Sequence, residues 1–155
     1  GRVKVGEVGF TIEFGRPGVG VRFRDINKMT TALASAGVEF EKKNPITTLL
    51  KDKATGEIRD DILNEKIMSA IVEIKVSIER CEEVVRLVWK VEKEVDTVVV
   101  LGVGVRCDEN GEDPIVLPVL KKLGYDPQRA KTNIGLGRIT NPDAIEKPQE
   151  AVSAR

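Results

Sequence analysis

Residues 70–106 constrain the fold of this chain more than any other part of the sequence. Two short segments rich in β-branched residues, 70–76 and the continuously apolar 98–101, flank a longer segment whose apolar residues recur at helical spacing. Runs of this length that are rich in β-branched residues are typical of strands. The pattern predicts a β-α-β unit with parallel strands and a right-handed crossover.

The middle of this unit has the pattern of an amphipathic helix. Ser77 can cap it, and Glu82 and Arg86 are spaced to pair on its polar side. Its apolar stripe comprises Ile78, Cys81, Val84, Val85, Val88 and Val91. We therefore expect one face of this helix to pack on the sheet.

Other segments extend the prediction. The alternation in 8–14 and 19–24 predicts two strands of a hairpin joined by a turn at 15–18. A helix is expected from Asp25, as its cap, to Gly37, and a short one over 61–68, whereas 41–61 has the composition of a loop with one turn at 46–50. Because 98–101 is continuously apolar, we expect it to be an interior strand covered on both faces.

The predicted fold is therefore a single α/β domain. We assign it to residues 1–140, with a mixed, mainly parallel sheet, helices packed on it, and a polar tail at 141–155. A chain of 155 residues can bury such a core without disulfides or metals.

Composition excludes several functional classes. The chain has no histidine, which excludes catalytic triads and histidine-based metal sites. Its 25 basic residues balance 25 acidic ones, so its net charge gives no attraction to nucleic acid or an anionic membrane. With no apolar segment of membrane-spanning length, no signal pattern, and two cysteines expected to stay reduced, we predict a cytoplasmic protein. Abundant Val, Glu and Lys with two Gln resemble the composition of thermophilic proteins.

The pentapeptide Gly-Val-Gly-Val-Arg occurs twice, at 18–22 and at 102–106. Each copy follows an apolar run and precedes an acidic residue and a helical pattern, as expected of an internal strand-turn-helix duplication. Glycine lets backbone N–H groups approach an anion, which a guanidinium can grip with two hydrogen bonds. The repeat predicts a ligand-binding set of Gly18, Gly20, Arg22, Gly102, Gly104 and Arg106. The alternative is a chance recurrence in strand sequence, with glycine marking a bulge or a close backbone approach.

Further candidates lie outside the repeat. Arg16 belongs to a basic cluster with Arg22, Arg24 and Lys28, and a third glycine pair contributes Asn133, Gly135, Gly137 and Arg138. Each set also has a non-functional interpretation. The basic cluster is compatible with a solvated strand face, and the third glycine pair with a glycine-rich connection between elements. No pair completes a dinucleotide or P-loop fingerprint.

Asp25 and Asp108 are the candidate catalytic groups, because each carboxylate follows one of the two arginines of the repeat. The acidic loop 108–113 alternates oxygen-bearing side chains but lacks the pattern of an EF-hand. We predict no dedicated metal site, and Mg²⁺ stays open as a companion of a bound phosphate.

Two functional hypotheses follow. The first is a small cytoplasmic enzyme, a transferase or lyase, that binds an anionic, phosphorylated or nucleotide-like metabolite in a Gly- and Arg-lined pocket at strand C-terminal ends. The second is a non-catalytic module, either a ligand sensor or a homo-oligomeric assembly subunit that buries its Val-rich surfaces. We also expect the protein to form a homo-oligomer.

Overall fold

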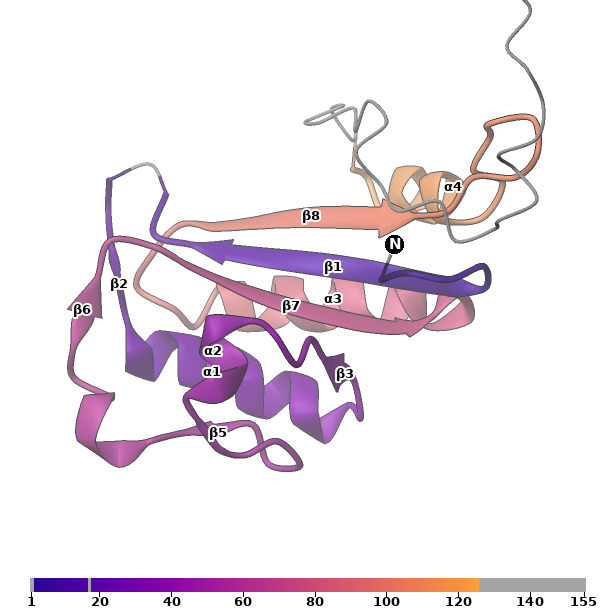
Figure 1. Cartoon of the computed structure of the whole chain (residues 1–155). Helices are drawn as coiled ribbons and strands as arrows, with labels where there is room; N and C mark the ends of the chain where they lie inside the picture. The colour runs from indigo at the N-terminus through magenta and orange to yellow at the C-terminus, as the bar shows by residue number, and fades with distance from the viewer. Residues whose placement is uncertain (1, 17, 126–155) are drawn as a thin grey trace, which may run out of the picture. The chain divides into compact units, whose positions relative to one another are not determined.

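The computed structural model of the protein, which describes residues 2–16 and 18–125, contains a four-stranded sheet (Figure 1). Its strands lie in the order β3 (Glu39–Phe40), β7 (Ala70–Ser77), β1 (Glu7–Phe14) and β8 (Val99–Val105), and every pair is antiparallel. The described helices and strands all belong to one compact unit, Val3–Pro127.

The expectation of a mainly parallel sheet is wrong. Strands β7 and β8, which precede and follow α3 (Cys81–Glu92) along the chain, do run in the same direction. In the sheet, however, β1 lies between them and is antiparallel to both. The predicted strand-helix-strand unit is thus split by a strand from the start of the chain. Hydrophobic periodicity gives the type of each element, and it carries no information about which strand is inserted between two others.

The order of elements around the sheet defines a known topology. Two successive strand-helix-strand passages, β1-α1-β3 and β7-α3-β8, with the strand order β3-β7-β1-β8, form the split β-α-β arrangement called ferredoxin-like. Helix α1 comprises Phe23–Ser35. Figure 1 shows α1 and α3 on the same side of the sheet.

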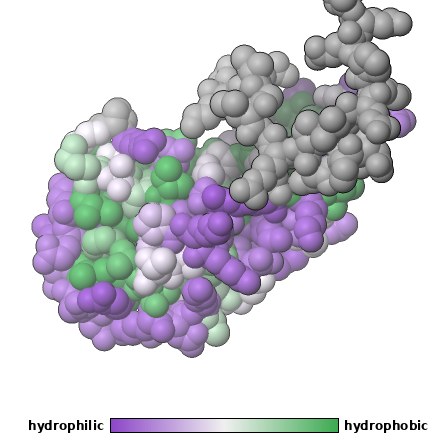
Figure 2. Space-filling view, in the orientation of Figure 1, coloured by the Kyte–Doolittle hydropathy of each residue, from purple (hydrophilic) through white to green (hydrophobic). Residues whose placement is uncertain are grey.

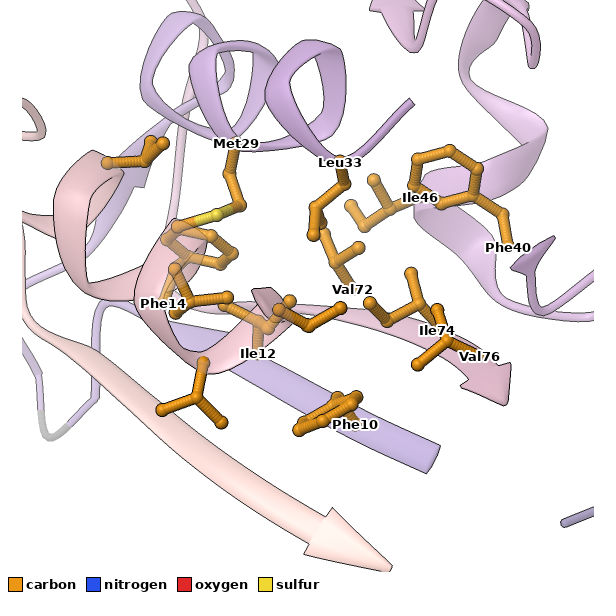
Figure 3. Close-up of a cluster of buried hydrophobic side chains, with 14 of the residues drawn as sticks. Phe10, Ile12, Phe14, Met29, Leu33, Phe40, Ile46, Val72, Ile74 and Val76 are labelled. Carbon is orange, nitrogen blue, oxygen red and sulfur yellow. The ribbon is translucent and has the colours of Figure 1, made fainter. Parts of the chain in front are cut away.

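The core fills the space between these helices and the sheet (Figure 3). On β1 the residues Val8, Phe10, Ile12 and Phe14 are buried, and Gly9, Thr11 and Glu13 face the other side. The alternation predicted for this strand is confirmed. Strand β7 alternates likewise, and α3 buries the predicted stripe of Cys81, Val84, Val85, Val88 and Val91. Glu82 and Arg86 pair as expected, with 2.7 Å between Oε1 and Nη2.

Strand β8 lies at an edge of the sheet, and the prediction of an interior strand covered on both faces is wrong. Its side chains Val99, Leu101 and Val103 pack against the core, whereas Val98 and Val100 are 42% and 48% exposed. A continuous run of valine is therefore compatible with an edge strand that has one open face.

The predicted hairpin of 8–14 with 19–24 is also absent. Strand β2 (Val21–Arg22) pairs with β6 (Lys66–Ile67) in a separate two-stranded sheet, and Phe23 already begins α1. Asp25 lies in the first turn of that helix, three residues after the cap position occupied by Arg22. Gly37, with φ of +67°, follows the helix C-cap Ala36.

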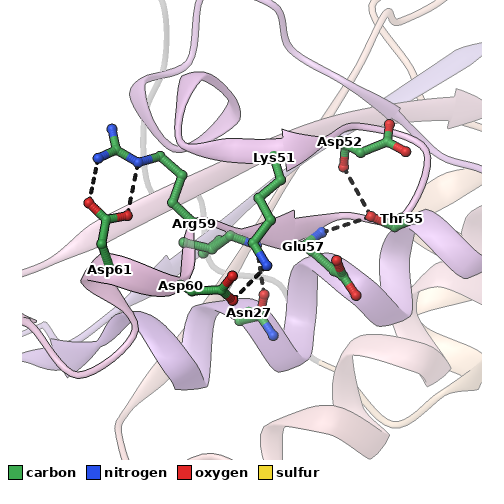
Figure 4. Close-up of polar contacts among 9 residues, drawn as sticks. Asn27, Lys51, Asp52, Thr55, Glu57, Arg59, Asp60 and Asp61 are labelled. Carbon is green, nitrogen blue, oxygen red and sulfur yellow. Dashed lines mark hydrogen bonds and ion pairs between the residues drawn. The ribbon is translucent and has the colours of Figure 1, made fainter.

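The segment expected to be a loop, 41–61, is built from short elements (Figure 4). They are α2 (Pro45–Thr48), β4 (Leu50–Asp52), β5 (Glu57–Ile58) and the 3-10 helix η1 (Asp60–Ile62). Outside this segment, a second 3-10 helix, η2 (Ile78–Arg80), precedes α3. The Ile58 N–H donates to Asn27 Oδ1 at 2.7 Å, which ties β5 to α1. Instead of the helix predicted for 61–68, η1 and β6 occupy these residues.

Some predictions lie outside the described residues. These are the candidates Asn133, Gly135, Gly137 and Arg138 and the tail 141–155. Within residues 2–16 and 18–125, no helix has the length and apolar character needed to cross a lipid bilayer.

Candidate functional site

The structure separates the two copies of the repeated pentapeptide. Gly18–Arg22 follows the C-terminal end of β1, where Phe14 pairs with Val99, whereas Gly102–Arg106 extends to the opposite end, where Val8 pairs with Val105. Six strand steps between Val8 and Phe14 correspond to roughly 20 Å. Arg22 and Arg106 are therefore not brought together.

The two copies also differ in backbone conformation. Gly18 and Gly20 have φ of +72° and +78°, in a turn, whereas Gly102 and Gly104 lie inside β8 and have no positive φ. Different conformations at corresponding residues favour chance recurrence over duplication.

One glycine of the second copy has a packing role. A Cβ added to Gly102 would overlap the Thr11 hydroxyl oxygen, so its absent side chain allows close contact with β1. A Cβ added to Gly104, which pairs with Gly9, would be 4.0 Å from the nearest atom, so no such contact requires glycine there. Arg106 is exposed just beyond the strand and lines neither of the two hollows described below.

The acidic loop after β8 is stabilised by its own carboxylates. Asp108 Oδ1 accepts from the N–H groups of Asn110 and Glu112, both at 2.9 Å. Asp113 accepts three N–H groups at the start of α4 (Val116–Lys122), from Ile115, Val116 and Leu117. The described residues contain no cluster of acidic or cysteine side chains able to hold a metal ion. Asp108 is thus engaged in shaping a turn.

A hollow of about 370 Å³ lies where β2 meets α1, and we call it the basic hollow. It is lined by Gly20, Val21, Arg22, Arg24, Asp25, Lys28, Lys66 and Asp96. Three candidate site residues, Gly20, Arg22 and Asp25, contribute to it, together with Arg24 and Lys28 of the basic cluster noted in the sequence. Four basic side chains face two carboxylates, so the lining carries a positive excess.

Short backbone contacts position this lining. The N–H groups of Phe23 and Arg24 donate to the carbonyls of Glu65 and Leu63, at 3.1 and 2.9 Å, which ties the first turn of α1 to the segment before β6. The Thr97 hydroxyl donates to Gly20 O at 2.7 Å, which holds the stretch preceding β8 at the same place.

Glycine suits position 20 because its φ of +78° lies in the left-handed region. An added Cβ would also stand 3.0 Å from the backbone oxygen of Ile67, and 2.8 Å from Cε of the flexible Lys66 side chain, which could move away.

The closest feature to an anion site is a pair of like charges. In the register of β2 with β6, Arg22 lies directly opposite Lys66. Directly opposed side chains in antiparallel strands have Cβ atoms about 5 Å apart, and like charges there are destabilising. Arg22 donates to Asn64 O at 2.7 Å, whereas Lys66 has no polar partner among the described residues.

The two carboxylates at the hollow differ in availability. Asp25 is buried, with Lys28 Nζ 3.3 Å from its Oδ1, and the same ammonium donates to Glu94 O at 2.7 Å. Asp96 is exposed, and it has no ion-pair or hydrogen-bond partner in the part of the chain that the structure describes. The Arg24 guanidinium likewise has no ion-pair or hydrogen-bond partner within those residues.

Sequence reasoning missed Lys66 and Asp96. Each is separated from Arg22 by more than 40 positions and has no neighbouring motif, so only the β2–β6 pairing and the path before β8 bring them in. Besides Gly102, Gly104, Arg106 and Asp108, the predicted residues Arg16 and Gly18 also stay outside the hollow. Arg16 pairs with Glu13 at 3.2 Å, and Gly18 is in the exposed turn.

A second hollow, of about 320 Å³, lies near Lys75. Here the charges neutralise one another, since Lys75 Nζ is 3.0 Å from Glu7 and 3.5 Å from Glu39. Hydrogen bonds from the Lys4 backbone and then from Lys75 lower the pKa of the Glu7 carboxyl. An arrangement already satisfied internally is a weaker candidate for a ligand site than the basic hollow.

The comparisons add no function to this geometry. No protein-family model, no curated protein and no solved structure matches the chain.

Proposed function

We propose that the protein binds a small anionic metabolite, phosphorylated or nucleotide-like, in the basic hollow. The observation that carries this proposal is the opposition of Arg22 and Lys66 across β2 and β6. Two adjacent cations are unfavourable by themselves and become favourable once an oxyanion accepts hydrogen bonds from both. Arg24, unpartnered among the described residues, supplies a third donor group at the same hollow.

Binding is supported more directly than catalysis. Asp25, predicted as an acid-base group, is buried and engaged with Lys28, so its best-supported role is to hold that ammonium at the rim. If the anion is a substrate of a transferase or lyase, Asp96 is the carboxylate free to act as a base or to accompany Mg²⁺.

The proposal includes the cytoplasm as the place of action. Cys81 and Cys107 are both free thiols, the state that a reducing compartment maintains.

Replacing Lys66 by Met tests the proposal. Removing one of two opposed cations should raise the free energy of unfolding by about 0.2 to 1 kcal/mol. The same change should weaken phosphate or pyrophosphate binding by about tenfold or more, because a charge-assisted hydrogen bond is lost. Calorimetric titration and urea unfolding of the same variant measure the two effects.

Lys53→Met is the matched control, because Lys53 is exposed and outside the hollow. It should leave both quantities nearly unchanged. Pyrophosphate affinity that is equal in the wild type and K66M would contradict the proposal.

A second candidate function, homo-oligomeric assembly, rests on strand β8. This edge strand has seven residues and none is charged, although charged residues or proline usually block edge strands from pairing with other chains. Val100, 48% exposed, lies on its open face. Two copies could pair β8 with β8 and continue the antiparallel sheet.

Light scattering after size exclusion tests this candidate. A dimer in the wild type that becomes a monomer in Val100→Lys supports pairing through β8. Val5→Lys, at a site 82% exposed and outside the sheet, should leave the mass unchanged. A wild-type monomer at all concentrations would reject assembly and leave the anion proposal intact.

A further inference from the structure

Three exposed apolar residues lie close in sequence to residues that line the basic hollow. Val19, Met68 and Val98 are 46%, 78% and 42% exposed, and we call them the apolar collar. Each lies one or two positions from a lining residue of the hollow, namely Gly20, Lys66 and Asp96. The collar and the cationic lining therefore belong to the same three chain segments.

The backbone of Gly15 brings these segments together. Its N–H donates to Val98 O at 3.0 Å, and its carbonyl accepts from the N–H of Val19 at 3.0 Å. A Cβ added to Gly15 would be 2.9 Å from Met68 O, so that segment touches it as well. Segments distant along the sequence are held at one point by a residue without a side chain.

In Figure 2, apolar surface lies among polar surface at the end of the described unit where β2 and β6 lie. Met68 in particular exposes most of its side chain, although burial of a methionine is worth about 1.5 to 3 kcal/mol. An apolar ligand group beside the charged site would recover part of that free energy.

We propose that the ligand is amphipathic, a phosphate ester whose charged head enters the basic hollow and whose hydrocarbon chain covers Met68 and its neighbours in the collar. This inference rests on the proposed function and adds the ligand class to it. Charge complementarity positions the head at Arg22 and Lys66, and the collar recognises the chain without hydrogen bonds.

A series of alkyl phosphates, from inorganic phosphate through ethyl and butyl to hexyl phosphate, tests the inference by calorimetric titration of the full chain. Affinity should rise by about two- to fourfold for each methylene that contacts the collar. Met68→Ser should flatten this rise and leave the affinity for inorganic phosphate unchanged. Since Met68 is 78% exposed, the variant should fold normally.

Val5→Ser is the matched control, because it removes an exposed apolar side chain elsewhere and should keep the rise with chain length. Equal affinity for all members of the series, or an undiminished rise in M68S, would overturn the inference while phosphate binding still supported the proposed function. If no member binds the wild type, the proposed function fails together with the inference.

Vesicles of equal parts phosphatidylcholine and phosphatidic acid distinguish the two sources of such a ligand. Cosedimentation that is lost in both K66M and M68S assigns a membrane lipid. Binding of hexyl phosphate without cosedimentation assigns a free amphiphile. Both outcomes support the inference, whereas cosedimentation unaffected by M68S contradicts it.

Discussion

Glycines in this protein are required for different structural reasons, and the sequence alone does not distinguish these reasons. Gly20 is favoured by its positive φ, whereas Gly102 is needed because an added Cβ would overlap the Thr11 hydroxyl oxygen. In the sequence, the glycines at 18–22 and 102–106 form one repeated motif, which is compatible with a close approach to a ligand. The sequence does not reveal that the segment 102–106 lies against another strand instead.

Gly56 offers the sharpest residue-level prediction. Its φ is +71°, and an added Cβ would overlap the Thr30 carbonyl, so Gly56→Ala should lower the free energy of unfolding by about 2 to 4 kcal/mol. Gly111 has φ of +80° with open space around it, and Gly111→Ala should cost only about 1 kcal/mol. Urea unfolding of both variants measures the loss in free energy of unfolding and so separates steric crowding from backbone strain. An equal loss in the two variants would contradict the predicted contact of residue 56 with α1.

At the scale of elements, local pattern predicted the long ones and failed for the short ones. Strand β7 and the buried stripe of α3 follow directly from periodicity. Strands β2 and β6 have two residues each, too few for any period to register. The basic hollow depends on the pairing of β2 with β6. Arg22 and Asp25 could be predicted from the sequence, whereas Lys66 could not, because nothing in the sequence indicates this pairing.

The contact between α3 and α4 should respond to pH. Hydrogen bonds from Arg86 and then from Lys122 lower the pKa of Glu82, and Lys122 Nζ lies 3.1 Å from Glu82 Oε2. A carboxyl with a lowered pKa in the folded state stabilises the fold above its unfolded pKa of about 4.5, and this contribution is lost as the pH falls through the lowered value.

Glu82→Gln should therefore reduce stability at neutral pH, and the difference from the wild type should disappear in acid. Urea unfolding over a series of pH values measures it. Glu92, on the same helix and without an ion-pair partner in the described part of the chain, gives the control Glu92→Gln, for which we expect a smaller pH-dependent difference. A constant difference for E82Q from neutral pH to acid would contradict the role of this ion pair.

For the whole molecule, the decisive feature is the insertion of β1 between β7 and β8. The sequence predicted all three strands and assigned the wrong neighbours, because pairing depends on contacts between distant parts of the chain. Because β1 lies between β7 and β8 and runs antiparallel to both, the sheet is antiparallel, and the two copies of the pentapeptide lie at opposite ends of it. The error in topology and the dispersal of the predicted site therefore have one cause.

A central β1 also predicts that the described unit unfolds as one. Ile12 is fully buried and pairs with Val72 on one side and Leu101 on the other, so Ile12→Ala should cost about 2 to 5 kcal/mol. Far-ultraviolet circular dichroism and the fluorescence of Trp89, the single tryptophan, should report the same lowered midpoint, since α3 packs on the sheet that β1 joins. Thr11→Ala, one position along and on the open face, should cost less than about 1 kcal/mol. Separate transitions for the two probes would show that β8 or α3 can leave the sheet while β1 and β7 stay paired, against the central role of β1.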